Sequence, residues 1–273
     1  MHQEFLMGNQ AIALGALAAG VRLVAGYPGT PSTEVLETVA KNRQENTYVE
    51  WSVNEKSAME VGAGAAYTGA RTMVTMKQVG LNVAADPLMS LEYIGVKGGM
   101  VILVADDPGP ISSQTEQDTR HFARFSKLPC FDPSTVQEAY DMVQEAFEYS
   151  EKYGTPVFFR STTRVSHGYA SIQVKDVEEY KNVEPEGFVK DTKRWVIFPK
   201  LSYQAHINIE ARNEELTKVF SQYKRNLLMP AEDDCKELKK GIATGGFNYT
   251  YVTEAMADLG QLRELKVSTP HPF

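Results

Sequence analysis

The chain has 273 residues, which at about 150 residues per domain suggests one large domain or two smaller ones. Its 28 basic and 35 acidic residues give a net charge of −7, which argues against a nucleic-acid-binding groove. The only cysteines are Cys130 and Cys235, too few for a disulfide scaffold or a cysteine-ligated metal centre, and this usage fits a reducing cytoplasm. The longest apolar stretch, residues 11–25, is broken by Arg22 and is too short to cross a membrane.

Helical and strand patterns alternate from the N-terminus to about residue 165. We predict helices over residues 8–19, 31–43, 54–67, 82–95, 114–125 and 134–153, and strands over 21–25, 48–52, 71–76, 100–105, 128–131 and 156–160. Continuous apolar strands that alternate with helices predict an α/β fold, with a parallel sheet of about six strands covered by helices on both faces.

The character of the sequence changes after about residue 170. Residues 174–199 are rich in Lys, Asp and Glu, and residues 210–228 look helical and strongly charged. A strand over 241–244, a helix from about Tyr249 and a strand over 265–268 then predict the start of a second α/β unit. We therefore expect a first domain over 1–170, a charged connector over 171–238, and an incomplete domain over 239–273. About 33 residues cannot form a core of their own, so either they pack on the first domain or the chain is a fragment of a longer one; we favour a fragment.

The loops that follow the strands are where a parallel sheet places its ligands. The first strand leads into GYPGTPSTE, where Thr30 is expected to cap a helix that begins at Pro31. This segment is either an ordinary turn or an anion site suited to a carboxylate, because it combines backbone amides with a helix N-terminus.

Glu55 follows the second strand and opens the helix that Asn54 is expected to cap. It is either an acid that interacts favourably with the helix dipole or a buried carboxylate that exchanges a proton with a bound ring. Gly62 and Gly64 in the middle of this helix each cost about 1 kcal/mol relative to alanine, which suggests a flat face that another helix or domain approaches.

The third and fourth strands lead into a glycine-containing turn, Gln78-Val79-Gly80, and into Asp106-Asp107-Pro108-Gly109. Two acids followed by prolines usually form only a stiff turn, but this turn closes the same rim. The sequence contains no P-loop, no nucleophile elbow and no HExxH motif, and we predict no metal-ligating residues.

Four segments together resemble one family. GYPGTPSTE resembles the signature of 2-oxoacid:ferredoxin oxidoreductases. The segments YVEWSVNEKSAMEVGAGAAYTGAR, MVTMKQVGLNVAADPLMSLEYIGVKGG and VILVADDPGPISSQTEQDTR are similar to the alpha subunits of its indolepyruvate-specific branch. The resemblance covers about residues 5–170 closely and 241–270 more loosely, as the start of a transketolase-C-terminal-like domain.

This resemblance implies a thiamine diphosphate enzyme, with residues 1–170 as its pyrimidine-binding domain. It implies that Glu55 hydrogen-bonds the aminopyrimidine ring as the catalytic carboxyl, that Gln78, Val79 and Gly80 line the ring's pocket, and that Tyr27, Gly29, Thr30 and Asp107 shape the substrate site. The implied reaction decarboxylates aryl 2-oxoacids oxidatively, with coenzyme A as acyl acceptor and ferredoxin as electron acceptor. It also implies a smaller partner subunit or missing C-terminal domains, and an oligomeric enzyme.

The chain departs from the family in two ways. It has no GDG…N motif to hold magnesium and the diphosphate, and no cysteine clusters for iron–sulfur centres, so both must lie in parts absent from this chain. We therefore expect the chain alone to be inactive and to bind the cofactor weakly or not at all. Two alternatives remain: a non-oxidative thiamine diphosphate enzyme, or a non-catalytic interaction subunit whose contact face is residues 62–66.

Overall fold

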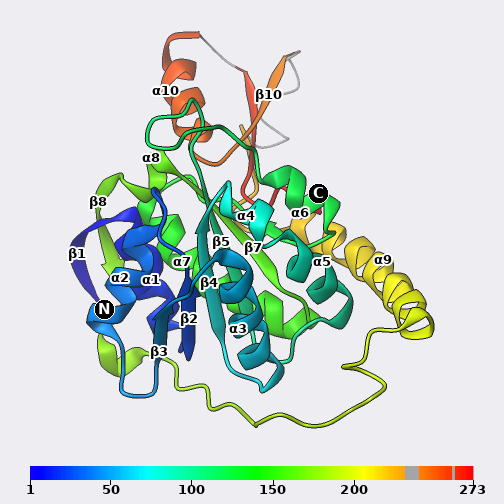
Figure 1. The fold of residues 1–273 in the computed structure, drawn as a ribbon. Coiled ribbons are helices and arrows are strands. Elements are labelled where there is room, and N and C mark those ends of the chain that lie inside the picture. The colour runs from blue at the N-terminus through cyan, green and yellow to red at the C-terminus, as the bar shows by residue number, and fades with distance from the viewer. Residues whose placement is uncertain (231–239, 260–261, 273) are drawn as a thin grey trace.

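A six-stranded parallel sheet forms the centre of the fold, which was obtained as a computed structural model describing residues 1–230, 240–259 and 262–272 (Figure 1). Its strand order is β3-β2-β4-β5-β7-β6. The strands are β2 (Leu23–Gly26), β3 (Tyr48–Trp51), β4 (Thr72–Lys77), β5 (Met100–Asp106), β6 (Cys130–Phe131) and β7 (Val157–Thr162). Every residue of β5 is buried, as expected for a central strand covered on both faces. The predicted α/β class is confirmed.

Helices cover both faces of this sheet. One face carries α1 (Gly8–Ala18), α2 (Thr33–Asn42) and α7 (Val136–Tyr153), and the other carries α3 (Glu55–Tyr67), α5 (Ala85–Ile94) and α6 (Arg120–Phe125). Successive residues of β4 alternate between the two faces, because Met73 packs in the first cluster and Val74 in the second. Two short helices, α4 (Gly80–Val83) and α8 (Thr163–Ser166), follow β4 and β7.

The two strands of a small separate sheet were not predicted, and neither was β9 (Leu227–Met229). β1 (His2–Met7) pairs in antiparallel fashion with β8 (Tyr169–Val174) and forms a small separate sheet. Only Leu6 of β1 is buried, so the strand lacks the apolar alternation by which a half-buried strand is recognised. Its pairing depends on a partner more than 160 residues away in the chain.

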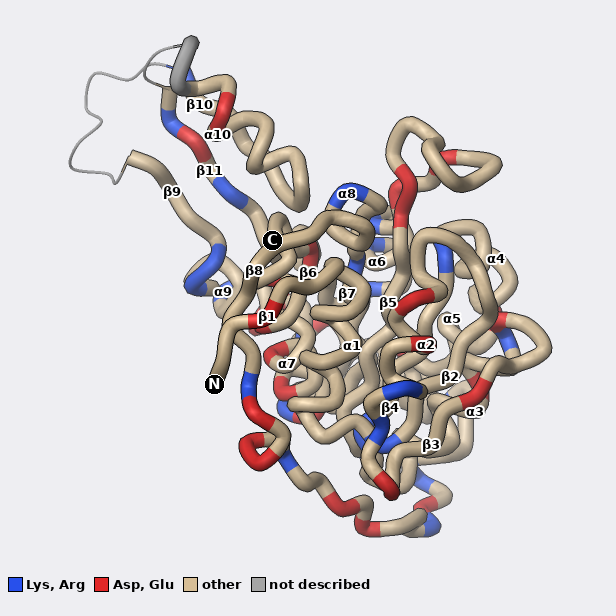
Figure 2. Tube along the Cα trace, turned by 90° about the vertical axis from the view of Figure 1, so that its left-hand side faces the viewer, with Lys and Arg blue, Asp and Glu red and all other residues tan. Residues whose placement is uncertain are grey.

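Residues 175–198 of the charged connector cross the edge of the sheet at which the parallel strands begin. Apart from a short 3-10 turn, η1 (Val177–Glu179), this stretch runs without helix or strand, and acidic and basic residues follow one another along it (Figures 1 and 2). Arg22, just before β2, holds it by donating to the Val183 carbonyl at 2.8 Å and pairing with Glu184 at 2.6 Å. The helix predicted over 210–228 is wrong in its bounds: α9 spans Pro199–Ser221, and β9 (Leu227–Met229) follows.

A second, smaller sheet lies at the C-terminal end of the chain, in the order β10-β11-β9. β10 (Gly241–Gly245), α10 (Asn248–Leu259) and β11 (Arg263–Val267) confirm the predicted strand, helix and strand to within two residues. The Cys130 amide donates to the His271 carbonyl at 2.8 Å, which fastens this unit to β6 of the first sheet.

A buried carboxyl group between α5 and α9 makes stability depend on pH. Burial raises the pKa of Glu92 from 4.5 to about 7, against the opposing influence of Arg212 and Lys127. Between these two values the folded state binds more protons than the unfolded state, so stability falls as the pH rises. We expect Glu92→Gln to stabilise the chain by about 1 to 2 kcal/mol at pH 8, after allowance for solvent screening, and to change little at pH 4.5.

Thermal unfolding at both pH values measures this effect. Glu37→Gln, on the exposed side of α2, is the matched control and should leave the pH profile unchanged. A wild-type Tm that does not fall between pH 5 and pH 8 would contradict the assignment.

Candidate functional site

The residues predicted to form a site come from four loops at one edge of the sheet, because parallel strands all end there. Glu55 opens α3 after β3, and Gln78, Val79 and Gly80 follow β4. Tyr27, Gly29 and Thr30 follow β2, and Asp107 follows β5. This edge lies at the top of Figure 1 and faces α10.

The sequence around Glu55 fixes its position at the start of a helix. Asn54 is extended and its side chain accepts a hydrogen bond from the Ser57 amide at 2.9 Å, which confirms the predicted cap. As a residue, Glu55 is only 5% exposed, and its carboxylate forms no hydrogen bond or ion pair with another described residue. A largely buried carboxyl without a protein partner suits a bound molecule that supplies one, because buried polar groups are rarely left unsatisfied.

Gly80 provides the space in which the Glu55 carboxyl lies. A Cβ atom at Gly80 would come within 2.3 Å of Glu55 Oε1 and 2.7 Å of its Cγ. The glycine is required by this approach rather than by its backbone conformation. The first residue of α4 therefore sets where the carboxyl group of α3 can sit.

This contact makes Gly80→Ala a test of the site. The added methyl group displaces the Glu55 carboxyl, so the affinity for the aminopyrimidine cofactor that the sequence resemblance implies should fall about tenfold or more, because a contacting group that is misplaced by about 1 Å is costly. Gly64→Ala on α3 is the control, since a Cβ there meets nothing within 4 Å. Titration of cofactor binding by calorimetry measures the effect, and equal affinity in both variants would contradict the role of Gly80.

Gln78 brings a second unpaired group to the same turn. It is fully buried, and its amide nitrogen donates to the Thr115 carbonyl at 2.8 Å. Its side-chain oxygen is buried and has no hydrogen-bond partner. Such an acceptor fits a donor on a bound molecule, because buried polar groups are rarely left unsatisfied.

The turn after β2 differs from its prediction at the start of the helix. The helix begins at Thr33 with Ser32 as its N-cap residue, and the predicted start at Pro31 is wrong. Two hydrogen bonds close a turn before the helix. The Gly29 amide donates to Thr33 Oγ1 at 3.0 Å, and the Ser32 amide donates to the Gly29 carbonyl at 2.9 Å. Tyr27 is 41% exposed beside it.

Asp107 organises the long loop that closes the rim. The amides of Ile111, Ser112 and Ser113 donate to Asp107 Oδ2 at 2.6–2.8 Å, and Thr163 Oγ1 donates to Oδ1 at 2.5 Å. Burial opposes ionisation, but these bonds outweigh it and hold the pKa of Asp107 below its ordinary value. The predicted substrate role of Asp107 stays a prediction, and in the structure its carboxylate holds the rim loop in place.

The helix predicted over 114–125 is wrong in its first half. Only α6, Arg120–Phe125, is helical, and residues 107–119 form an irregular loop whose far end Asp106 holds through the amide and hydroxyl of Thr119. Sequence reasoning missed the role of Asp106, and it missed Arg160 and Asp132. Arg160 pairs with Asp106 at 2.8 Å and with Asp132 at 3.0 Å, and all three side chains are buried. Although burial opposes it, the two carboxylates raise the pKa of Arg160, which is therefore charged.

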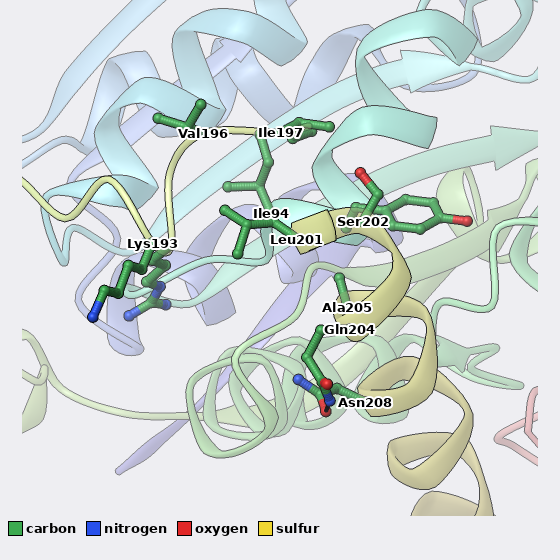
Figure 3. Close-up of a pocket in the computed structure, with 11 residues that line it drawn as sticks. Ile94, Lys193, Val196, Ile197, Leu201, Ser202, Gln204, Ala205 and Asn208 are labelled. Atoms are coloured by element: carbon green, nitrogen blue, oxygen red, sulfur yellow. Dashed lines mark hydrogen bonds between the residues drawn. The ribbon is translucent and has the colours of Figure 1, made fainter. Parts of the chain in front are cut away.

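Several cavities lie outside this edge group, and two of them border the rim loop or the connector. One, of about 340 Å³, opens between the rim loop and the start of α10 and is lined by Arg120, Arg160, Arg164 and Tyr251 among others. The other, of about 230 Å³, lies between α5, the connector and α9, where Ile94, Val196, Ile197 and Leu201 give it an apolar lining (Figure 3). Neither cavity is lined by a predicted site residue.

The two mid-helix glycines of α3 have different surroundings. A Cβ at Gly62 would meet Val74 of β4 at 2.6 Å, so Gly62 permits close packing on the chain's own sheet. That explains Gly62 without an external partner. Gly64 is exposed and faces open space.

Comparisons with known proteins agree on one family. Residues 14–242 match the family described as "Pyruvate flavodoxin/ferredoxin oxidoreductase, thiamine diP-bdg". The chain is 43% identical over 273 residues to the indolepyruvate oxidoreductase subunit IorA of Pyrococcus abyssi, covering 98% of this chain but 42% of that protein. It is 30% identical over 228 residues to the 2-oxoglutarate synthase subunit KorA of Methanocaldococcus jannaschii, covering 80% of this chain and 61% of that protein.

A solved structure shares the fold. The 2-oxoglutarate:ferredoxin oxidoreductase of Magnetococcus marinus superposes with a TM-score of 0.80 at 18% identity, over 99% of this chain and 54% of that one. The chain thus spans roughly half the length of the proteins it matches. Within the described residues, no helix combines the length and apolar character needed to span a membrane.

Proposed function

The chain belongs to the pyruvate flavodoxin/ferredoxin oxidoreductase family, in the region that binds thiamine diphosphate, and from this premise we propose that it is the pyrimidine-binding part of an aryl-2-oxoacid:ferredoxin oxidoreductase. The observation that carries the proposal is the buried, unpartnered carboxyl of Glu55, set by Gly80 at the ligand edge of the sheet. The similarity to IorA proteins supports indolepyruvate or a related aryl pyruvate as substrate.

The residues at this edge fit an aminopyrimidine ring. Gln78 Oε1 is a buried acceptor without a donor, and the Glu55 carboxyl has no partner of its own. Glu55 would share a proton with a ring nitrogen, Gln78 would accept from a ring amino group, and Val79 and Gly80 would line the pocket. When bound, thiamine diphosphate would supply the carbon nucleophile that decarboxylation of a 2-oxoacid requires. Glu55 tunes that chemistry by holding the proton at the ring, away from water.

The turn after β2 would receive the substrate. Thr30 and Gly29 would face the carboxylate of the 2-oxoacid, Tyr27 would lie at the edge of its site, and Asp107 would hold the rim loop against it. The Ser113 hydroxyl donates to the Thr30 carbonyl at 3.2 Å, which supports this arrangement by linking the rim loop to the turn.

The rest of the enzyme would come from outside this chain. Residues 1–170 would be the pyrimidine-binding domain, 171–238 the connector, part of which lies outside the described residues, and 239–273 the beginning of a further α/β domain. Magnesium, the diphosphate site and the iron–sulfur clusters would lie in other domains or in a smaller partner subunit. Coenzyme A and ferredoxin would be the acyl and electron acceptors of a cytoplasmic, oligomeric enzyme.

Reduction of a low-potential dye tests the proposal. The complete enzyme should reduce the dye only when an aryl pyruvate and coenzyme A are both present, whereas this chain alone should be inactive. Decarboxylation by the complete enzyme without dye reduction would favour a non-oxidative thiamine diphosphate enzyme instead. Oxidation by this 273-residue chain alone would contradict the proposed division of the site.

A further inference from the structure

A lysine lies over the turn that is proposed to receive the substrate. Lys77 is the last residue of β4 and shares a sheet face with Met73 and Thr75, the face covered by α1, α2 and α7. A Cβ added to Gly29 would meet Lys77 Cδ at 2.9 Å, Cγ at 3.0 Å and Cε at 3.4 Å. The stem of Lys77 therefore passes directly over Gly29, and a larger residue in the turn would displace it.

The ammonium group of Lys77 is uncompensated. Among the described residues it takes part in no ion pair, and its one hydrogen bond is a long one, 3.4 Å, to Gln114 Oε1. Lys56, in contrast, pairs with Asp86 at 2.8 Å. Lys77 is partly buried, so its positive charge is screened less than that of a surface lysine.

Apart from Glu55, whose helix α3 packs on the other face of the sheet, two acidic residues of this edge, Asp107 and Glu34, have other partners. The Asp107 carboxylate is occupied by Thr163 and the loop amides, and Glu34 accepts from Asn9 Nδ2 at 2.8 Å and lies 3.5 Å from His167 Nε2. The rim loop places Ser113 on the Thr30 carbonyl and, one residue later, Gln114 beside Lys77. The rim loop therefore contacts both Thr30 and the ammonium group of Lys77, and this places the cation near Thr30.

We propose that Lys77 binds the carboxylate of the 2-oxoacid substrate, with Gly29 providing the space through which its side chain reaches the site. This rests on the proposed function, which supplies the 2-oxoacid. A substrate carboxylate near Thr30 would accept a charge-assisted hydrogen bond from Lys77, and its negative charge would neutralise the lysine ammonium group. A phosphate of the cofactor or of coenzyme A would offer the same attraction, and the experiment separates these sources.

Calorimetry on the complete enzyme with two matched probes tests the inference. The probes are 3-phenylpropionate, which has the carboxylate, and 3-phenylpropionamide, which lacks its charge. We expect Lys77→Met to weaken binding of the acid about 10- to 100-fold and to leave binding of the amide unchanged. Lys77→Arg should keep most of the preference for the acid, and Lys41→Met, at the far end of α2, should behave as wild type.

Kinetics add a second readout. Lys77→Met should raise the KM for the aryl pyruvate by a similar factor, and leave the KM for coenzyme A and the half-saturating cofactor concentration within about twofold. Gly29→Ala, which keeps the lysine but displaces its stem, should raise the same KM by a smaller factor. Unchanged acid affinity in Lys77→Met would overturn the inference, and so would a loss confined to coenzyme A or the cofactor.

The two proposals can fail separately. A wild-type complete enzyme that oxidises no 2-oxoacid contradicts the proposed function, while the calorimetric comparison of acid and amide still tests Lys77. An active wild type whose Lys77→Met variant keeps its KM contradicts only the role of Lys77.

Discussion

Replacing Glu55 by glutamine should lower kcat/KM of the complete enzyme by about 100-fold or more, as loss of a positioned acid–base group usually does. Glutamine matches the size of glutamate, so it fits beside Gly80, but it cannot exchange a proton with a ring nitrogen. The carboxyl has no partner among the described residues, so its removal breaks no hydrogen bond of the fold. Dye-coupled oxidation of an aryl pyruvate measures the loss.

Glu60→Gln is the matched control, because Glu60 is an exposed glutamate of the same helix. Its activity should equal that of wild type, and both variants should unfold at temperatures within a few degrees of each other. A fully active Glu55→Gln enzyme would contradict the catalytic assignment. It would favour the alternative in which the domain serves only as an interaction subunit.

The strands of the central sheet were predictable because burial on both faces leaves a simple signal. Residues 100–105 are all apolar and Asp106 follows them, and the whole strand Met100–Asp106 is buried. The position of Glu55 was predictable for a similar local reason, since Asn54 caps α3 through its own side chain. Both features depend on a few neighbouring residues, and tertiary contacts reinforce the local preference.

The features that were missed depend on residues far apart in the chain. β1 and β8 are stabilised by each other, and neither carries a strong pattern alone. The segment 114–119 has helix-forming residues, but Asp106 holds its end through Thr119, and Asp107 holds residues 111–113 just before it, through bonds that no local pattern encodes. The passage of Lys77 over Gly29 joins residues 48 positions apart. The site residues could therefore be named from the sequence, while the contacts that position them could not.

Arg160 connects the rim of the site to the core of the sheet. It lies on β7 and pairs with Asp106 at the end of β5 and with Asp132 just after β6, while Asp106 in turn holds Thr119 at the far end of the rim loop. All of these charges are withdrawn from water, with Arg160 5% and the two carboxylates at most 1% exposed. A buried network of this kind is stable only while every member has its partner.

We expect Arg160→Leu to destabilise the chain by about 3 to 5 kcal/mol, because it leaves the Asp106 carboxylate buried without a counter-charge and Asp132 with only its longer pair to Arg120 at 3.9 Å. Urea unfolding measures this loss, and Arg164→Leu, at an exposed position on α8, is the control that should cost less than about 0.5 kcal/mol. The triple replacement of Arg160, Asp106 and Asp132 by leucine should be less destabilised than Arg160→Leu alone, because it removes the stranded charges together with the arginine. If the triple variant were the less stable of the two, packing and the hydrogen bonds to Thr119 would outweigh charge compensation as the contribution of this network.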